Sequence, residues 1–167
     1  RDDEHVPEDV TRVIIHSSVR AIKEKAFEEY GQLRIVILND GLEEIGYDAF
    51  SFCTSLRGIV IPNIVKRIEL TAFHECTGMT DVTLGEGLEE IGIGAFRFCT
   101  SIQRIVIPNA VKKIKYQAFL CCSSLATVTL GDGLDEIGEA TFYRCESLRS
   151  IAISDAVKTI EREAFKE

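Results

Sequence analysis

The chain has 167 residues, 46% of them hydrophobic, which is the size and composition of one folded domain and excludes a disordered segment. Its formal net charge of −8 argues against binding to the phosphate backbone of nucleic acids and against adsorption to an anionic membrane, since both need a basic surface. No apolar run approaches the roughly 20 residues that span a bilayer, and no signal peptide is recognisable at residues 1–9.

A unit of 23 residues follows this charged flank, residues 1–9, and repeats without an insertion. A phenylalanine recurs at the same position of every unit, as Phe27, Phe50, Phe73, Phe96, Phe119, Phe142 and Phe165. A cysteine lies three residues after it in five units, as Cys53, Cys76, Cys99, Cys122 and Cys145, and Tyr30 takes this place in the first. We therefore predict one domain, residues 10–167, whose seven repeats begin at residues 10, 33, 56, 79, 102, 125 and 148.

Each repeat begins with the pattern of a short strand. In the third repeat Ile59 and Ile61 alternate with Val60, which is the two-residue period of a strand with one buried face, and Pro62 ends it. The Ala-Phe-x-x-Cys stretch that follows is too short for a regular helix, so we expect one helical or 3-10 turn on the convex side. Because one unit of this length cannot bury its own apolar face, we expect the repeats to stack as a solenoid with a parallel sheet on the concave side.

One column of the repeat alternates in charge. It follows the position that holds Val in odd-numbered repeats and Leu in even-numbered repeats. Odd-numbered repeats carry a cation there and even-numbered repeats carry an acid: Arg20, Lys66, Lys112 and Lys158, and Glu43, Glu89 and Asp135. A uniform column would stack like charges about 5 Å apart, so we interpret the alternation as a ladder of opposite charges that specifies register. Each exposed pair contributes only about 0.2–1 kcal/mol.

The repeating unit L-x-x-I-x-I-P-x-x-V-x-x-I-x-x-x-A-F-x-x-C resembles the BspA-type leucine-rich repeat over residues 10–167. The asparagine ladder of common leucine-rich repeats is missing, because its position holds Ser18, Gly41, Ile64, Gly87, Ala110, Gly133 and Ala156. The resemblance implies a right-handed leucine-rich-repeat solenoid of the α/β class, mainly β, that binds proteins and has no catalytic residues. Members of this family include surface adhesins of bacteria and large families in single-celled eukaryotes.

Other chemistry is disfavoured by the spacing of the reactive residues. Cysteines at a strict 23-residue interval indicate a buried column of free thiols, with a disulfide or a zinc site as the alternatives. Cys121 lies outside this column and is either exposed and oxidisable or simply packed. His5, His16 and His74 occupy unrelated places in the repeat, so no catalytic group converges. We therefore expect no enzyme activity, no metal and no cofactor.

Two functions fit such a chain: a scaffold that binds a protein partner, and a structural spacer or filament-forming segment of a longer protein. The first candidate surface consists of outward-facing strand residues and nearby arginines on the concave side. They are Arg12, Ile14, Arg34, Ile35, Ile37, Arg57, Val60, Asp81, Arg104 and Val106. Apolar residues rimmed by arginine are typical of recognition patches, whereas branched residues also suit exposed strands for their β-propensity alone.

The second candidate surface is a column outside the core pattern, Tyr47, Leu70, Ile93 and Tyr116, which is charged at both ends. Exposure of this column, to which Phe52 and Phe98 add aromatic area, would mark an interface; packing against a neighbouring loop is the alternative. The final repeat stops before its cysteine position, so we expect a longer array, fraying or end-to-end self-association. The sequence predicts no single cellular location. The family resemblance allows the cell surface, whereas free cysteines and the absence of Asn-x-Ser/Thr motifs allow an intracellular location.

Overall fold

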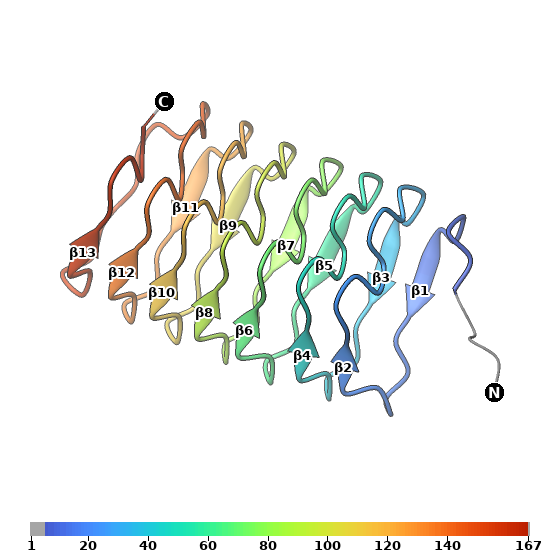
Figure 1. Cartoon of the computed structure of the whole chain (residues 1–167). Helices are drawn as coiled ribbons and strands as arrows, with labels where there is room; N and C mark the ends of the chain where they lie inside the picture. The colour runs from blue at the N-terminus through green and yellow to red at the C-terminus, as the bar shows by residue number, and fades with distance from the viewer. Residues whose placement is uncertain (1–5, 167) are drawn as a thin grey trace.

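The computed structural model describes residues 6–166, in which the chain winds as a solenoid with one strand row on each of two sides (Figure 1). Strands of three residues form the first row: β1 (Arg12–Ile14), β3 (Ile35–Ile37), β5 (Gly58–Val60), β7 (Asp81–Thr83), β9 (Arg104–Val106) and β11 (Thr127–Thr129). Strands of two residues form the second row: β2 (Ala21–Ile22), β4 (Glu44–Ile45), β6 (Arg67–Ile68), β8 (Glu90–Ile91), β10 (Lys113–Ile114), β12 (Glu136–Ile137) and β13 (Thr159–Ile160).

Every strand pair is parallel, and partners lie one repeat apart. Gly58 pairs with Asp81 and Ile45 pairs with Ile68, each across 23 residues. The two-residue strands form one seven-stranded sheet, whereas the three-residue strands pair as β1–β3, β5–β7 and β9–β11. In the described part of the seventh repeat, the segment 150–152 forms no strand. The predicted alternation is confirmed, because Ile59 is buried and Val60 is 65% exposed.

The Ala-Phe-x-x-Cys stretch forms turns, and no helical or 3-10 turn is found within residues 6–166, which differs from our expectation. Backbone hydrogen bonds alternate along it: the N–H of Phe50 donates to Ala72 O in the next repeat at 2.8 Å, whereas that of Ser51 donates locally to Asp48 O at 3.1 Å. Asp48 and Phe52 have positive φ angles of 52° and 59°. Their left-handed backbone conformation interrupts the right-handed helical conformation of the residues between them, so every second N–H group in this stretch points to the neighbouring repeat.

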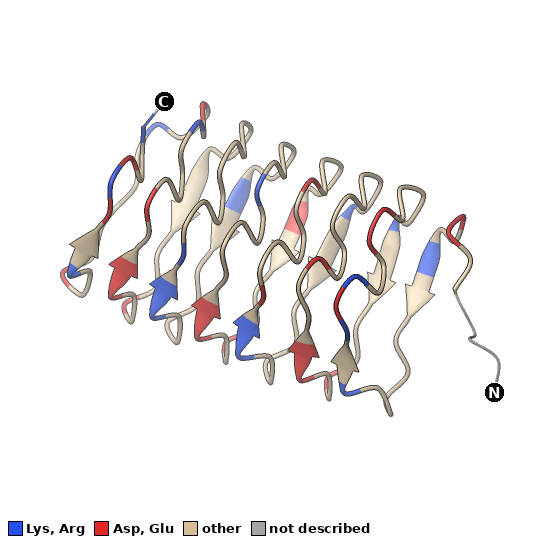
Figure 2. Ribbon diagram, in the orientation of Figure 1, with Lys and Arg blue, Asp and Glu red and all other residues tan. Residues whose placement is uncertain are grey.

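The predicted ladder of opposite charges is confirmed for two of its neighbouring pairs, whereas Arg20 and Lys112 donate to the carbonyl oxygens of Gly41 and Gly133. Lys66 Nζ lies 3.0 Å from Glu89 Oε1, and Lys158 Nζ lies 2.7 Å from Asp135 Oδ1. The neighbouring column alternates as well, so the arrows of β4, β6, β8, β10 and β12 alternate between red and blue in Figure 2. Because these side chains are exposed, the ladder contributes little to stability and mainly opposes a shift of register.

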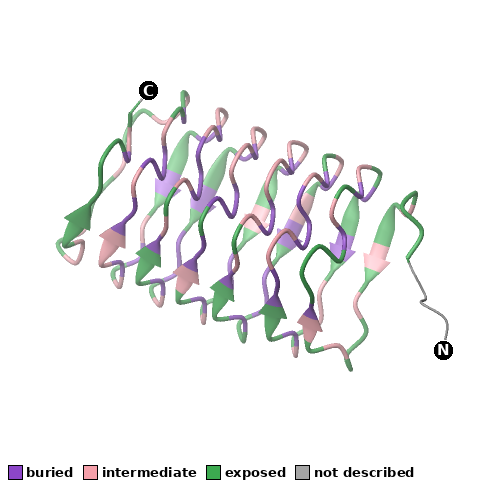
Figure 3. Ribbon diagram, viewed as in Figure 1, coloured by how far each residue is buried: buried purple, intermediate pink, exposed green. Residues whose placement is uncertain are grey.

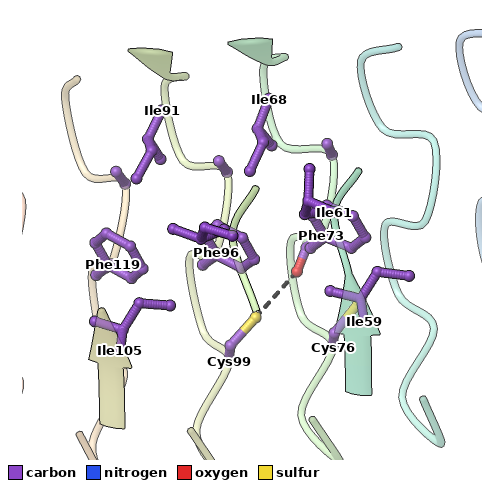
Figure 4. Packing of buried hydrophobic residues seen from close by; sticks show 14 of the residues in the cluster. Ile59, Ile61, Ile68, Phe73, Cys76, Ile91, Phe96, Cys99, Ile105 and Phe119 are labelled. Atoms are coloured by element: carbon purple, nitrogen blue, oxygen red, sulfur yellow. Dashed lines mark hydrogen bonds between the residues drawn. The ribbon is translucent and has the colours of Figure 1, made fainter. Parts of the chain in front are cut away.

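The core is a single column enclosed by the two strand rows and the turns (Figure 3). Adjacent phenylalanine rings stack nearly parallel, with centroids 5.2–5.4 Å apart. The column cysteines are buried free thiols, as predicted, and each donates a hydrogen bond to a phenylalanine carbonyl of the preceding repeat. Figure 4 shows one of them, from Cys99 Sγ to Phe73 O, at 3.1 Å. The thiols therefore link successive repeats as well as filling space.

Tyr30 takes the cysteine's position in the first repeat. Its ring is buried edge-on against Phe27, with centroids 5.5 Å apart. Its hydroxyl donates to the carbonyl oxygen of Val6 in the flank at 2.6 Å. The larger side chain thus covers one end of the phenylalanine stack. In the last described repeat Ile160 is 49% exposed and Ile153 is 38% exposed.

Candidate protein-binding surface

We use the name strand face for the outward residues at positions 11, 12 and 14 and their equivalents every 23 residues, which lie directly before or on the three-residue strands in the first six repeats and on the equivalent non-strand segment in the seventh. The inward residue of each strand is wholly or partly buried, so the outward ones stand clear of the core (Figure 3). Ile14, Val60 and Val106 are each more than 60% exposed, and Ile35 and Ile37 more than 40%. The predicted exposure of these apolar residues is therefore confirmed.

Strand register decides which of these residues meet. Ile14 pairs with Ile37, and Val60 occupies the next place in the same column, so three aliphatic side chains follow one another. Ile35 lies beside them, paired with Arg12. Thr83 pairs with Val60 and separates it from Val106. The structure thus brings four of the five predicted apolar residues into one patch, and Val106 lies outside it.

A hollow opens beside Gly58, at the place where the neighbouring strands present Ile35 and Asp81. It has a volume of about 170 Å³ and is lined by Val36, Gly58, Ile59, Val60, Asp81 and Thr83. A Cβ atom at Gly58 would lie 2.8 Å from the carbonyl oxygen of Asp81. Glycine therefore permits close approach of β7 and leaves room for a side chain from outside.

The predicted arginines of the strand face, Arg12, Arg34, Arg57 and Arg104, are all exposed. Within residues 6–166, their guanidinium groups take part in no ion pair, hydrogen bond or ring contact. Arg149 shares the column of Arg34 and Arg57 and is equally exposed and unpartnered, although our sequence prediction omitted it. Its 23-residue spacing was the signal that could have identified it.

Sequence comparison identifies the architecture that carries this surface. The model of the BspA type leucine-rich repeat region matches in six copies, over residues 7–119 and 67–167. The chain belongs to the BspA-type leucine-rich repeat family. Its fold is the right-handed leucine-rich-repeat solenoid that the resemblance implied. A comparison with curated proteins gives no match.

Solved leucine-rich repeat proteins of bacteria share the fold of this BspA-type chain. A protein of Eubacterium ventriosum aligns with a TM-score of 0.82 at 23% identity, over 94% of this chain and 42% of that one. TpLRR of T. pallidum aligns with a TM-score of 0.67 at 24% identity, over 83% of this chain and 78% of that one. A protein of Bacteroides ovatus gives 0.58 at 26% identity, over 91% of this chain and 51% of that one. The chain thus spans less than half of the E. ventriosum protein.

The second predicted surface of this BspA-type solenoid, which we call the tyrosine column, is also exposed. Leu70, Ile93 and Tyr116 are 43–46% exposed and Tyr47 is half-buried, so the alternative of burial within the repeats is wrong for three of the four. Hollows of about 470 Å³ flank Tyr47 and Tyr116 at the two ends of the column. Three glutamates and one lysine line each hollow, so both are acidic, and Lys23–Glu44 is the one ion pair between two lining residues within residues 6–166.

Phe52 and Phe98 do not extend the tyrosine column, because both pack edge-on against His74. The ring centroids lie 5.2 and 5.8 Å from that of the histidine, and the guanidinium of Arg97 lies 5.0 Å from the Phe98 ring centre. Burial lowers the pKa of His74, although Glu75 acts in the opposite direction. These aromatic residues therefore cover one another on the turn side of the repeats.

The column thiols of this BspA-type repeat are buried, and burial disfavours their thiolate form. Burial raises the pKa of Cys53 and of Cys145 to about 12, and it raises those of Cys99 and Cys122 well above the usual range. Cys121 is partly exposed, and desolvation raises its pKa while Arg144 lowers it. Within residues 6–166 no three His, Cys, Asp or Glu residues are grouped as metal ligands, and no helix there has the length and hydropathy to cross a membrane.

Proposed function

We propose that the chain is a non-catalytic scaffold that binds a protein partner through the strand face. The observation that carries this proposal is the coincidence of an exposed aliphatic patch, Ile14, Ile35, Ile37 and Val60, with arginines that have no partner within the described chain. Aliphatic residues gain free energy when a partner covers them, and arginine is enriched in interfaces. The parallel pairing of β1 with β3 and of β5 with β7 beneath them supports the proposal, since a rigid surface loses little entropy on binding.

The patch could instead reflect only the β-propensity of branched residues. The hollow at Gly58 favours binding, because it offers space within the aliphatic patch for a side chain of the partner. The tyrosine column is the alternative surface of the same scaffold. Its exposed apolar residues support a contact, but its flanking hollows are acidic and carry no arginine, unlike the strand face.

Affinity capture from native cells with three baits tests the proposal. The baits are the wild-type chain, the strand-face variant Ile35→Ser/Val60→Ser, and the control Leu70→Ser/Ile93→Ser in the tyrosine column. We expect mass spectrometry to identify a protein that the wild type and the control retain and the strand-face variant loses. Retention by all three baits would contradict the proposal, and loss by the control alone would assign binding to the tyrosine column. Thermal melts establish that each bait is folded.

A second candidate function is a structural spacer or filament-forming segment of a longer protein. The parallel stacking of each repeat on its neighbours, with one continuous core, supports it. Light scattering over a concentration series tests the filament-forming function: a mass that rises with concentration supports it, and a constant monomer mass contradicts it.

A further inference from the structure

The charge of the strand face is opposite to that of the molecule. Its outward positions hold five arginines, Arg12, Arg34, Arg57, Arg104 and Arg149, and a single acid, Asp81. The face therefore has a net charge of +4 in a chain whose net charge is −8, so all other residues together carry −12. A basic face on an acidic molecule attracts anionic groups to one place only.

These five arginines are also the ones that the fold does not use. Every other lysine and arginine within residues 6–166 has a partner of its own. The partners are carboxylates for Lys23, Lys25, Lys66, Arg67, Lys113, Lys115, Lys158, Arg162 and Lys166, carbonyl oxygens for Arg20 and Lys112, and aromatic rings for Arg97 and Arg144. The alternating ladder supplies an acid beside nearly every cation on the seven-stranded sheet, and no such ladder exists on the strand face.

The choice of arginine indicates the kind of anion. All five cations of the strand face are arginine, although lysine supplies most of the cations that form ladder pairs. Arginine presents a planar fork that binds a carboxylate with two parallel hydrogen bonds, and it is enriched in interface cores, whereas lysine is depleted there.

The aliphatic patch between the arginines distinguishes a protein from a polyanion. Ile14, Ile35, Ile37 and Val60 need apolar side chains to cover them, which a uniform chain of sulfates or phosphates does not offer. A long polyanion would also extend beyond the face and meet the −12 charge of the remaining surface.

We infer that the partner presents a short acidic segment interspersed with aliphatic residues, whose carboxylates bind the strand-face arginines and whose apolar side chains cover the aliphatic patch. This inference rests on the proposed function of the same face. Arg12 and Arg104 lie four repeats apart, about 19 Å at 4.8 Å per strand, which about six extended residues span at 3.3 Å each. One aliphatic side chain of the segment occupies the hollow at Gly58.

Fluorescence anisotropy with a labelled 12-residue peptide, Glu-Glu-Leu repeated four times, tests the inference. We expect binding to the wild-type chain, and none for Lys-Lys-Leu repeated four times. The variant Arg34→Gln/Arg57→Gln should bind the acidic peptide at least about tenfold more weakly, the effect of losing two charge-assisted contacts. The control Lys66→Gln/Lys112→Gln, with the same net charge, should bind within about twofold of the wild type, since these lysines lie on the other sheet. Arg34→Lys/Arg57→Lys should lose part of the affinity, because lysine keeps the charge without the fork.

Three results would overturn the inference. Equal weakening in the glutamine variant and its control would mean that net charge alone is sensed. Binding of 12-residue polyglutamate or a heparin oligosaccharide as tight as that of the Glu-Glu-Leu peptide would replace the acidic-aliphatic segment with a general polyanion. An acidic peptide that fails to bind, while capture from cells still requires Ile35 and Val60, would remove the inference and leave the proposed function intact. Capture that is indifferent to Ile35 and Val60 would instead remove the proposed function.

Discussion

The stacked phenylalanines predict that the same substitution has very different effects at the centre and at the end of the solenoid. Phe96 is fully buried, and its ring lies 5.4 Å from that of Phe73 and 5.3 Å from that of Phe119. Phe165 has a ring neighbour only in Phe142, and it is half-buried. Replacing a buried phenylalanine by alanine costs about 3–5 kcal/mol through lost burial and the cavity that remains. Phe96→Ala should reach this range, whereas Phe165→Ala should cost about half as much.

Urea unfolding followed by circular dichroism measures both variants. A loss of about 4 kcal/mol in a domain of this size lowers the melting temperature by about 8–16 °C, so thermal melts provide an independent reading. Phe96→Leu separates the ring from its apolar volume, since leucine refills most of the cavity, and it should recover more than half of the loss. Equal losses for Phe96→Ala and Phe165→Ala would refute the reasoning, because they would mean that flanking rings do not determine the contribution of a layer.

Three further predictions concern other parts of the chain. Gly58→Ala should destabilise the fold by about 1–3 kcal/mol, since the new Cβ would lie 2.8 Å from Asp81 O. The control Gly31→Ala, whose new Cβ has its closest contact at 3.6 Å, should change the urea midpoint little. Equal urea midpoints for the two variants would contradict this prediction. In the native protein a thiol-alkylating reagent should modify Cys121 first, because the column cysteines are buried with raised pKa values; mass spectrometry showing early labelling of the column would refute it. Burial lowers the pKa of His74 below 6.5, so the folded state favours the neutral imidazole. The contribution of His74 to stability should therefore be complete above pH 6.5. It should decrease as the pH falls through 6.5 toward the lowered pKa. Unfolding free energies of the wild type and His74→Gln between pH 7.5 and 5 should therefore converge on acidification, and parallel curves would be the contrary result.

The sequence predicted those features that follow from the period alone. A 23-residue interval is enough to place Phe96 above Phe73 and to orient Ile59 inward and Val60 outward, because each position repeats the environment of its equivalent. The two-residue strands were missed, since two residues are too few to show a strand period. The left-handed turn positions were missed as well, because residues such as Asp48 and Phe52 stand there in place of the glycine that usually marks them.

The site was predictable in its apolar part and not in its electrostatics. Exposure of Ile14 and Val60 follows from strand alternation, which is a local property. Whether Arg34 or Lys66 has a partner depends instead on residues a full repeat away and on which columns lie side by side around the coil. The reversed charge of the strand face therefore became visible only when every cation could be matched with its neighbours in space.

The alternating charges make a pair of repeats the natural unit by which this protein can lengthen or shorten. Deleting residues 56–78, one repeat, would stack Glu43 on Glu89 and Leu42 on Leu88, so that two layers of the same shape and sign would meet. Deleting residues 56–101, two repeats, would set Glu43 beside Lys112 and restore the opposite sequence of charges. Duplications in multiples of 46 residues keep opposite charges adjacent at every junction, so an array of this kind is expected to lengthen by even numbers of repeats. Chimeras joined after an odd number of repeats should be less stable at the junction between the two parts.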